Sequence, residues 1–145
     1  QAVEGLMVRA GKEGKEIILS GDDRAKVFCD LEWSREALGN VVKNALDHTK
    51  KGERITLAWE QTPLMTRFTV TDNGEGIGAE DIHHIFKRFY RSRNAESAGA
   101  GLGLPLAKSI LEEQGGTIGV ESVSGEGAKF TLSFPAREKP GVYQI

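Results

Sequence analysis

Two short glycine-rich motifs contain the residues best suited to chemistry in this sequence. The first, DNGEGI at 72–77, follows the alternating, strand-like pattern TRFTVTD, so Asp72 is expected at the end of a strand. The second, GAGLGL at 99–104, runs directly into the helical pattern LPLAKSILEEQ. Glycines before a helix expose backbone amides to an anion and align the helix dipole with it. Together the two motifs predict a carboxylate near an anion-binding loop, an arrangement suited to a phosphate-bearing ligand.

Polar side chains elsewhere in the chain suit the same kind of ligand. Asn40 and Asn44 are one turn apart on a helix predicted at 34–49, so they share a face. An amide oxygen is a suitable ligand for a Mg²⁺ ion that is held mainly by phosphates. The segment FKRFYR at 86–91, with Arg93 just beyond it, concentrates cationic side chains. Guanidinium groups pair well with phosphate oxygens.

Each of these features also has a simpler interpretation. Glycines at a strand-to-helix junction often form only a turn, and asparagines on a helix are usually solvated. The motifs are not a P-loop, because no Gly-Lys-Ser/Thr follows. The basic segment is also typical of a solvated loop, and we expect Phe86 and Phe89 to be core anchors that tether a mobile lid. Only the combination favours a phosphate-binding site.

The elements that position these residues are predicted from hydrophobic periodicity. The pattern predicts helices at 1–13, 34–49, 79–86 and 103–114, the last of them ending at a left-handed cap at Gly115–Gly116. It predicts strands at 16–20, 55–60, 66–72, 117–123 and 128–134, and a short extended piece at 26–31. This order is typical of an α+β fold, a two-layer α/β sandwich in which about three helices cover one face of a mixed, mostly antiparallel sheet.

Length and composition fit a single globular domain. The chain has 145 residues, of which 39% are hydrophobic and 28% charged, as in ordinary folded proteins. A net charge of −2 provides no general attraction to nucleic acid or to an anionic membrane. The single cysteine, Cys29, excludes an internal disulfide and is expected to be a small buried hydrophobe. Because the sequence starts at Gln1 and not at methionine, we expect a fragment of a longer protein.

Four ordered motifs give the chain a specific resemblance. NVVKNALDHT at 40–49, DNGEGI at 72–77, FKRFYR at 86–91 and GAGLGL at 99–104 resemble four boxes of one protein family. These are the N box, first glycine box, F box and second glycine box of the ATP-binding catalytic domain of bacterial two-component sensor histidine kinases. That family shares a superfamily with type II topoisomerases, the large heat-shock chaperone and MutL. The resemblance covers roughly residues 15–135 and implies a Bergerat-type fold with a long ATP lid.

The resemblance implies roles for individual residues. Asn44 would ligate Mg²⁺, Asn40 would support the metal or the phosphates, and Asp72 would accept a hydrogen bond from the adenine amine. Arg91 would be the lid cation nearest the terminal phosphates, so that Asn40, Asn44 and Arg91 form the catalytic set. The other implied nucleotide contacts are Asp47, His48, Gly74, Gly76, Ile77, Tyr90, Gly99, Gly101, Leu102, Gly103 and Leu104. The glycines of the first box would let the backbone approach the base, and those of the second would let the lid fold onto the phosphates.

Three positions depart from the family's pattern. Members often have a lysine where this chain has Asp47 and a tyrosine where it has His48. His48 can still stack on a base, whereas Asp47 cannot replace a cation beside phosphates. Ala100 occupies a frequent threonine position, so one hydroxyl contact is missing. These departures imply weaker nucleotide binding, not its absence.

The residue at position 40 favours one branch of the superfamily. Relatives that hydrolyse ATP with water have a general-base glutamate there, as do anti-sigma serine kinases, whereas the Asn40 amide has no useful basicity. A neutral imidazole needs no such base, so the resemblance implies transfer of the ATP γ-phosphate to a histidine. His48, His83 and His84 lie outside a phosphoacceptor context, and the acceptor is expected on a separate domain. A degenerate nucleotide-binding or docking module, and a water-coupled ATPase, remain alternatives.

An expected organisation follows from the resemblance. Residues 1–14 would be the end of a linker helix from a dimerisation and phosphoacceptor domain, 15–135 the catalytic domain and 136–145 a C-terminal tail. Expected partners are the parent's own phosphoacceptor domain and a response regulator, with no nucleic acid. The fragment is expected to be monomeric and the parent homodimeric. By analogy, the domain would be cytoplasmic, in a parent anchored in the inner membrane of a bacterium.

Overall fold

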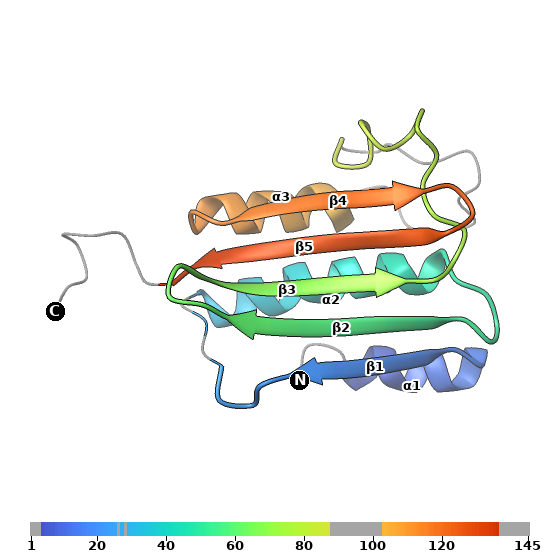
Figure 1. Ribbon diagram of the computed structural model, residues 1–145, viewed down its shortest axis with the longest axis horizontal. Coiled ribbons are helices and arrows are strands. Elements are labelled where there is room, and N and C mark those ends of the chain that lie inside the picture. The colour runs from blue at the N-terminus through green and yellow to red at the C-terminus, as the bar shows by residue number, and fades with distance from the viewer. Residues whose placement is uncertain (1–3, 26, 28, 88–102, 137–145) are drawn as a thin grey trace, which may run out of the picture.

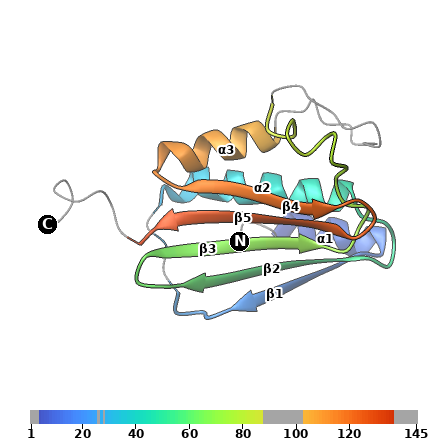
Figure 2. The same ribbon diagram turned by 45° about the horizontal axis from the view of Figure 1, so that its top comes forward.

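Three helices cover one face of a five-stranded sheet in the computed structural model, which describes residues 4–25, 27, 29–87 and 103–136 (Figure 1 and Figure 2). The helices are α1 (Glu4–Glu13), α2 (Leu31–Asp47) and α3 (Gly103–Glu113). The strands are β1 (Glu16–Gly21), β2 (Arg54–Gln61), β3 (Met65–Asp72), β4 (Thr117–Val123) and β5 (Gly127–Pro135). The predicted two-layer α+β fold is confirmed.

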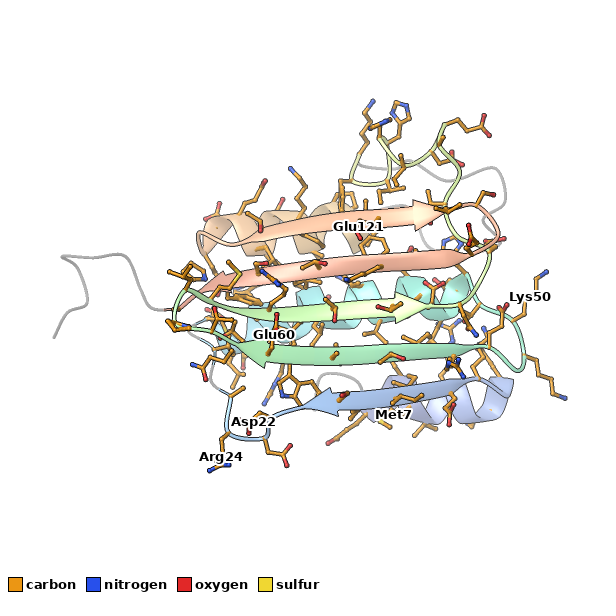
Figure 3. The ribbon with its side chains drawn as sticks, viewed as in Figure 1. Met7, Asp22, Arg24, Lys50, Glu60 and Glu121 are labelled. Atoms are coloured by element: carbon orange, nitrogen blue, oxygen red, sulfur yellow. The ribbon has the colours of Figure 1, made fainter. Side chains whose placement is uncertain are left out.

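The sheet is mixed and mostly antiparallel, with the strand order β1-β2-β3-β5-β4. β1 and β2 are parallel, because α2 crosses over between them, whereas the other neighbouring pairs are antiparallel. β3 is the central strand, and its last residue, Asp72, is paired with Ile55 of β2. The outer face of the sheet is polar and carries Glu60 and Glu121 (Figure 3). The Asp72 carboxylate therefore lies at the end of the central strand.

The hydrophobic core lies between α2 and the inner face of the sheet. Alternate residues of β2, β3 and β5 point inward, as a two-residue period requires, and meet the apolar face of α2. The fully enclosed side chains of this core include Val41, Val42, Leu46, Ile55, Val70, Phe130 and Leu132. Each such side chain stabilises the fold by roughly 1.5–3 kcal/mol relative to an exposed position. α2 is consequently the most firmly held helix and a rigid support for whatever it carries.

Two of the predicted elements differ from the observed ones. α2 begins at Leu31 rather than at residue 34, because Asp30 caps it by accepting a hydrogen bond from the Trp33 amide at 3.1 Å. The helix predicted at 79–86 is wrong, since this segment forms successive turns with hydrogen bonds between residues three apart, such as His84 N to Asp81 O at 2.8 Å. A segment of about eight residues recovers little of the nucleation cost by itself, so packing decides whether it becomes a helix.

The extended piece predicted at 26–31 is not confirmed, because its described residues 27, 29 and 30 form no strand and Leu31 opens α2. The predicted left-handed cap after α3 is confirmed. α3 ends at Glu113, and Gly115 forms the left-handed cap with a φ of +77°, while the amide of Gly116 donates to Leu111 O at 2.8 Å. Cys29 is a free thiol, half-buried against the core. Among the described residues, no helix has both the length and the hydrophobicity needed to cross a bilayer.

Candidate functional site

The polar residues of α2 lie beside the start of α3. A side chain added to Gly103 would have its Cβ 3.7 Å from the Cβ and Cγ atoms of Asn40, so the first residue of α3 packs directly against this asparagine. Asn44 lies one turn further along α2, and both asparagines are partly buried. Lys50, just beyond α2, projects from the same end of the molecule (Figure 3). Asn40 therefore faces the N-terminus of a helix, where the dipole favours an anion.

Asn40 has a buried polar atom that no described residue satisfies. Its Nδ2 is inaccessible to solvent and has no hydrogen-bond acceptor among the residues that the structure describes. Leaving such a donor unpaired costs roughly 1–3 kcal/mol, so unpaired donors are rare in folded proteins. A phosphate oxygen seated between Asn40 and the start of α3 would supply the missing acceptor. This feature is independent of the glycine motif and points to the same ligand chemistry.

Asp72 is a buried carboxylate at the end of β3. It is 6% exposed, and its Oδ1 accepts a hydrogen bond from the Gly74 amide at 2.9 Å. Burial raises the pKa of Asp72 above its usual value, and this effect is opposed in part by hydrogen bonds from the backbone amides of Gly74 and Ala128. The buried carboxylate is held in place by the backbone and keeps acceptor capacity for a ligand.

The raised pKa of Asp72 predicts a pH dependence of nucleotide binding. Only the ionised carboxylate is purely an acceptor, and protonation occurs at a higher pH than for an ordinary aspartate. We therefore expect ATP affinity to fall as the pH is lowered through this raised pKa. Titrating the wild type and Asp72→Asn over the same pH range checks this, because protonation of the nucleotide affects both proteins equally. A pH profile shared by the two proteins would contradict the prediction.

The loop after β3 is fastened to the hairpin between β4 and β5. The Ile77 amide donates to Ser122 Oγ at 2.7 Å, and this hydroxyl donates in turn to Gly127 O at 2.7 Å. The Gly125 amide donates to Glu75 O at 2.6 Å. Ser122 was not predicted as a site residue, because a serine in an alternating strand carries no signal of the loop that packs against it.

The glycines of DNGEGI are required by packing within the protein. A Cβ on Gly74 would lie 2.5 Å from the His48 carbonyl oxygen. Gly76 has a φ of +72°, and a Cβ there would collide with the Val123 carbonyl. The loop can therefore approach the end of α2 and the β4–β5 hairpin only because both residues lack a side chain. The prediction that Gly74 and Gly76 let the backbone approach the adenine base remains a prediction.

His48, at the C-terminal cap of α2, contacts the same loop. Its Nδ1 lies 2.9 Å from Glu75 Oε1, which fixes the orientation of the ring. His48 is also close enough to Asp72 to lower the pKa of that carboxyl slightly. Glu75 was not predicted as a site residue, because it lies between the two glycines of the motif and its partner is 27 residues away. The structure thus brings His48, Glu75 and Asp72 together.

Asp47 points to α1. Its Oδ1 accepts a hydrogen bond from Arg9 Nη2 at 2.8 Å, and the side chain is only 16% exposed. The carboxylate that departs from the family's lysine pattern is therefore already neutralised by a cation from another helix. Arg9 was not predicted, because an arginine on α1 has no sequence signal that connects it with position 47.

The lid residues are described only at their two ends. Phe86 packs edge-on against Phe130, with ring centroids 6.4 Å apart, which confirms it as a core anchor. At the other end, Gly103 and Leu104 open α3, and Leu104 packs against the core. The other predicted lid residues lie outside the described residues: Phe89, Tyr90, Arg91, Arg93, Gly99, Ala100, Gly101 and Leu102.

The donor set fits a magnesium ion that is held mainly by phosphates. Within the described ranges, no three His, Cys, Asp or Glu side chains gather as a metal site. Asn44 and Asn40 instead offer amide oxygens, which are neutral, hard ligands. Such a site is expected to need the ligand's phosphates to complete its coordination shell.

Comparison with known proteins agrees with the geometry. Residues 29–138 match the family described as "Histidine kinase-, DNA gyrase B-, and HSP90-like ATPase". The chain is 40% identical over 116 residues to Sensor protein IrlS of Burkholderia pseudomallei (strain K96243), covering 78% of this chain and 25% of IrlS. It is 38% identical over 135 residues to Sensor histidine kinase YvrG of Bacillus subtilis (strain 168), covering 91% of this chain and 23% of YvrG. This chain thus spans about a quarter of the length of these curated relatives.

The fold is also similar to that of a solved kinase. It matches the mycobacterial sensor histidine kinase MprB with a TM-score of 0.83 and 27% sequence identity, over 95% of this chain and 93% of that chain. The resemblance inferred from the four boxes is confirmed. The chain belongs to the histidine kinase-, DNA gyrase B- and HSP90-like ATPase family, and it has the ATP-binding catalytic fold of sensor histidine kinases.

Proposed function

We propose that this domain binds ATP with Mg²⁺ at the end of α2 and transfers the γ-phosphate to a histidine on a separate domain of its parent protein. The observation that carries the proposal is Asn40 Nδ2, which is buried beside the N-terminus of α3 and has no acceptor among the described residues. Family membership makes the ligand a nucleoside triphosphate rather than another anion. Asp72 supplies the acceptor for the adenine amine, and the neighbouring His48 ring supplies a stacking surface.

The phosphates then extend from the adenine site along α2 towards α3. Asn40 Nδ2 donates to a phosphate oxygen, and the amides at the start of α3 face the same group. Asn44 ligates Mg²⁺ through its amide oxygen, and Asn40 supports the metal or the phosphates. When bound, the metal neutralises charge that develops on the phosphates. Arg91, Tyr90 and the glycines at 99, 101 and 103 complete the lid in this proposal.

The reaction requires no general base from this domain. The lone pair of a neutral imidazole nitrogen attacks the γ-phosphorus, the bond from phosphorus to the β–γ bridging oxygen breaks, and ADP leaves with that electron pair. The phosphorylated ring, now cationic, then loses its one N–H proton from the other nitrogen to water. The protein contributes positioning and charge neutralisation, which suffice for a loose phosphoryl-transfer transition state. Relatives that hydrolyse ATP have a glutamate at position 40. The amide found here is consistent with a reaction that needs no general base from this domain.

Phosphoryl transfer in trans tests the proposal directly. The purified chain is mixed with the parent's phosphoacceptor domain and ATP labelled at the γ-phosphate. We expect an acid-labile, base-stable label on that domain, abolished by chelation of Mg²⁺, and little steady hydrolysis without the acceptor. Binding of ATP with no transfer at saturation would instead favour the docking-module alternative. Steady hydrolysis that disappears in Asn40→Ala would favour a water-coupled ATPase.

The organisation of the parent forms part of the same proposal. Residues 1–14 end a linker helix from a dimerisation and phosphoacceptor domain, 15–135 form the catalytic domain and 136–145 a tail. Its support is that the curated relatives are about four times as long as the region they share with this chain. The names of those relatives imply two-component signalling, in which the phosphohistidine is passed to a response regulator. A homodimeric parent at the inner membrane, with this domain in the cytoplasm, completes the proposal.

A further inference from the structure

A chain of ion pairs joins α1 to the C-terminal end of α2. Asp47 Oδ1 accepts from Arg9 Nη2 at 2.8 Å, and Arg9 Nε donates to Glu13 Oε2 at 2.7 Å. Glu13 Oε1 in turn accepts from Lys15 Nζ at 2.8 Å, and the same Nζ donates to Leu46 O at 2.7 Å. The network, which we call the α1 clasp, thus starts and ends on neighbouring residues of α2. Figure 2 shows α1 lying beside this end of α2.

The α1 clasp is better shielded from solvent than an ordinary surface ion pair. The side chain of Lys15 is 9% exposed, that of Asp47 16% and that of Arg9 31%, and Ala10 of α1 is buried. Glu13, which joins Arg9 to Lys15, is the most exposed member at 37%. By contrast, Arg67 and Glu60 on the outer face of the sheet are 40% and 59% exposed. Charges that are partly removed from water attract each other more strongly. The α1 clasp therefore holds α1 on α2 more firmly than the same number of fully exposed ion pairs would.

The C-terminal end of α2 needs these cations. The last turn of α2 contains no basic residue and ends with Asp47, whose charge is unfavourable at the negative end of the helix dipole. Arg9 neutralises that carboxylate, and Lys15 caps the Leu46 carbonyl. Docking of α1 thus stabilises the last turn of α2. That turn carries Asn44, and His48 follows directly at its cap.

We propose that the α1 clasp is a positioning device that couples the docking of α1 to nucleotide affinity. In this inference, which rests on the proposed function, Asp47 acts through Arg9 and not on the phosphates. A docked α1 holds the last turn of α2, and with it Asn44 and His48, in the geometry that binds nucleotide. Because such coupling is reciprocal, bound nucleotide must also stabilise the docked α1.

The two possible roles of Asp47 predict opposite changes in nucleotide affinity when its charge is removed. If Asp47 faces the phosphates, removing its negative charge relieves repulsion and tightens binding. If Asp47 holds α1, removing the charge loosens the last turn of α2 and weakens binding. Asp47→Asn therefore separates the roles without a change in side-chain shape.

The test is a double-mutant cycle on the 145-residue chain. Binding of AMP-PNP with Mg²⁺ is titrated for wild type, Arg9→Gln, Asp47→Asn and the double variant. We expect about a two- to fivefold loss of affinity in each single variant and no further loss in the double variant. Arg9→Lys should recover most of the loss, and Arg67→Gln, which removes the exposed pair with Glu60, should leave affinity unchanged. Melting curves verify that each variant is folded.

Hydrogen exchange supplies a readout that a purely structural role would not move. In the wild type, AMP-PNP should slow exchange of the α1 amides, and Arg9→Gln should reduce this effect. The inference would be overturned if Asp47→Asn bound AMP-PNP more tightly than the wild type, or if the losses of affinity added up in the double variant. It would also be overturned if AMP-PNP did not change the exchange rate of the α1 amides. Failure of the wild type to bind AMP-PNP would instead overturn the proposed function, so the two failures are distinguishable.

Discussion

Replacing Asp72 with asparagine is expected to weaken ATP binding at neutral pH by about tenfold or more. The Asp72 carboxylate can only accept hydrogen bonds, and one oxygen already serves the Gly74 amide at 2.9 Å. In the variant, one of the two oxygen positions becomes an NH₂ group, which would oppose the adenine amine. A buried mismatched polar contact costs roughly 1–3 kcal/mol, or about 5- to 150-fold in affinity. Isothermal titration calorimetry of ATP with Mg²⁺ measures the loss.

The same substitution should leave the fold intact, which makes the binding result interpretable. Asparagine keeps an oxygen that can accept from the Gly74 amide. Burial raises the pKa of Asp72, so between the unfolded and folded pKa values the folded protein binds more protons than the unfolded chain. Stability contributed by this group is therefore lost as the pH rises through that window. We expect the Asp72→Asn melting temperature at pH 7 to equal or exceed that of the wild type. Unchanged ATP affinity in a folded variant would mean that Asp72 does not contact the base.

Replacing Gly127 with alanine is expected to cost about 3–5 kcal/mol of unfolding free energy, from backbone strain together with a clash. Gly127 has a φ of +97°, which L-residues rarely adopt. A Cβ there would collide with the Asp72 carbonyl and lie 3.1 Å from Asn73 Cα, so β3 would have to move. Because this displaces Asp72, ATP affinity should fall with stability. Urea denaturation and calorimetry measure the two effects.

Gly125 offers a matched control in the same hairpin. Its φ of +84° is similarly unfavourable, but nothing lies within 4 Å of a Cβ built on it. Gly125→Ala should therefore cost only the backbone strain, about 1–2 kcal/mol, and should leave ATP affinity unchanged. Equal losses of stability in the two variants would show that the contact between Gly127 and β3 is unimportant.

Much of this molecule was predictable from local patterns in the sequence. The two-residue period of 55–60 and 66–72 and the apolar stripe around Val41 and Val42 gave the strands and the central helix, because side-chain direction follows directly from backbone geometry. The glycine pair at Gly115–Gly116 gave a helix end for an equally local reason. The segment at 79–86 was mispredicted, since its helical spacing was too short to decide between a helix and consecutive turns.

The sequence by itself determined the layers of the fold, the order of the four boxes and the identity of Asn40, Asn44, Asp72 and the box glycines as candidates. Only the tertiary structure decided what those residues touch. In the structure, Asp47 pairs with Arg9, His48 with Glu75, and Ile77 of the loop after β3 with Ser122. The residues of these pairs are 27 to 45 positions apart in the sequence. Periodicity carries no information about such pairs, because it records which face of an element a residue occupies and not which element will pack against that face.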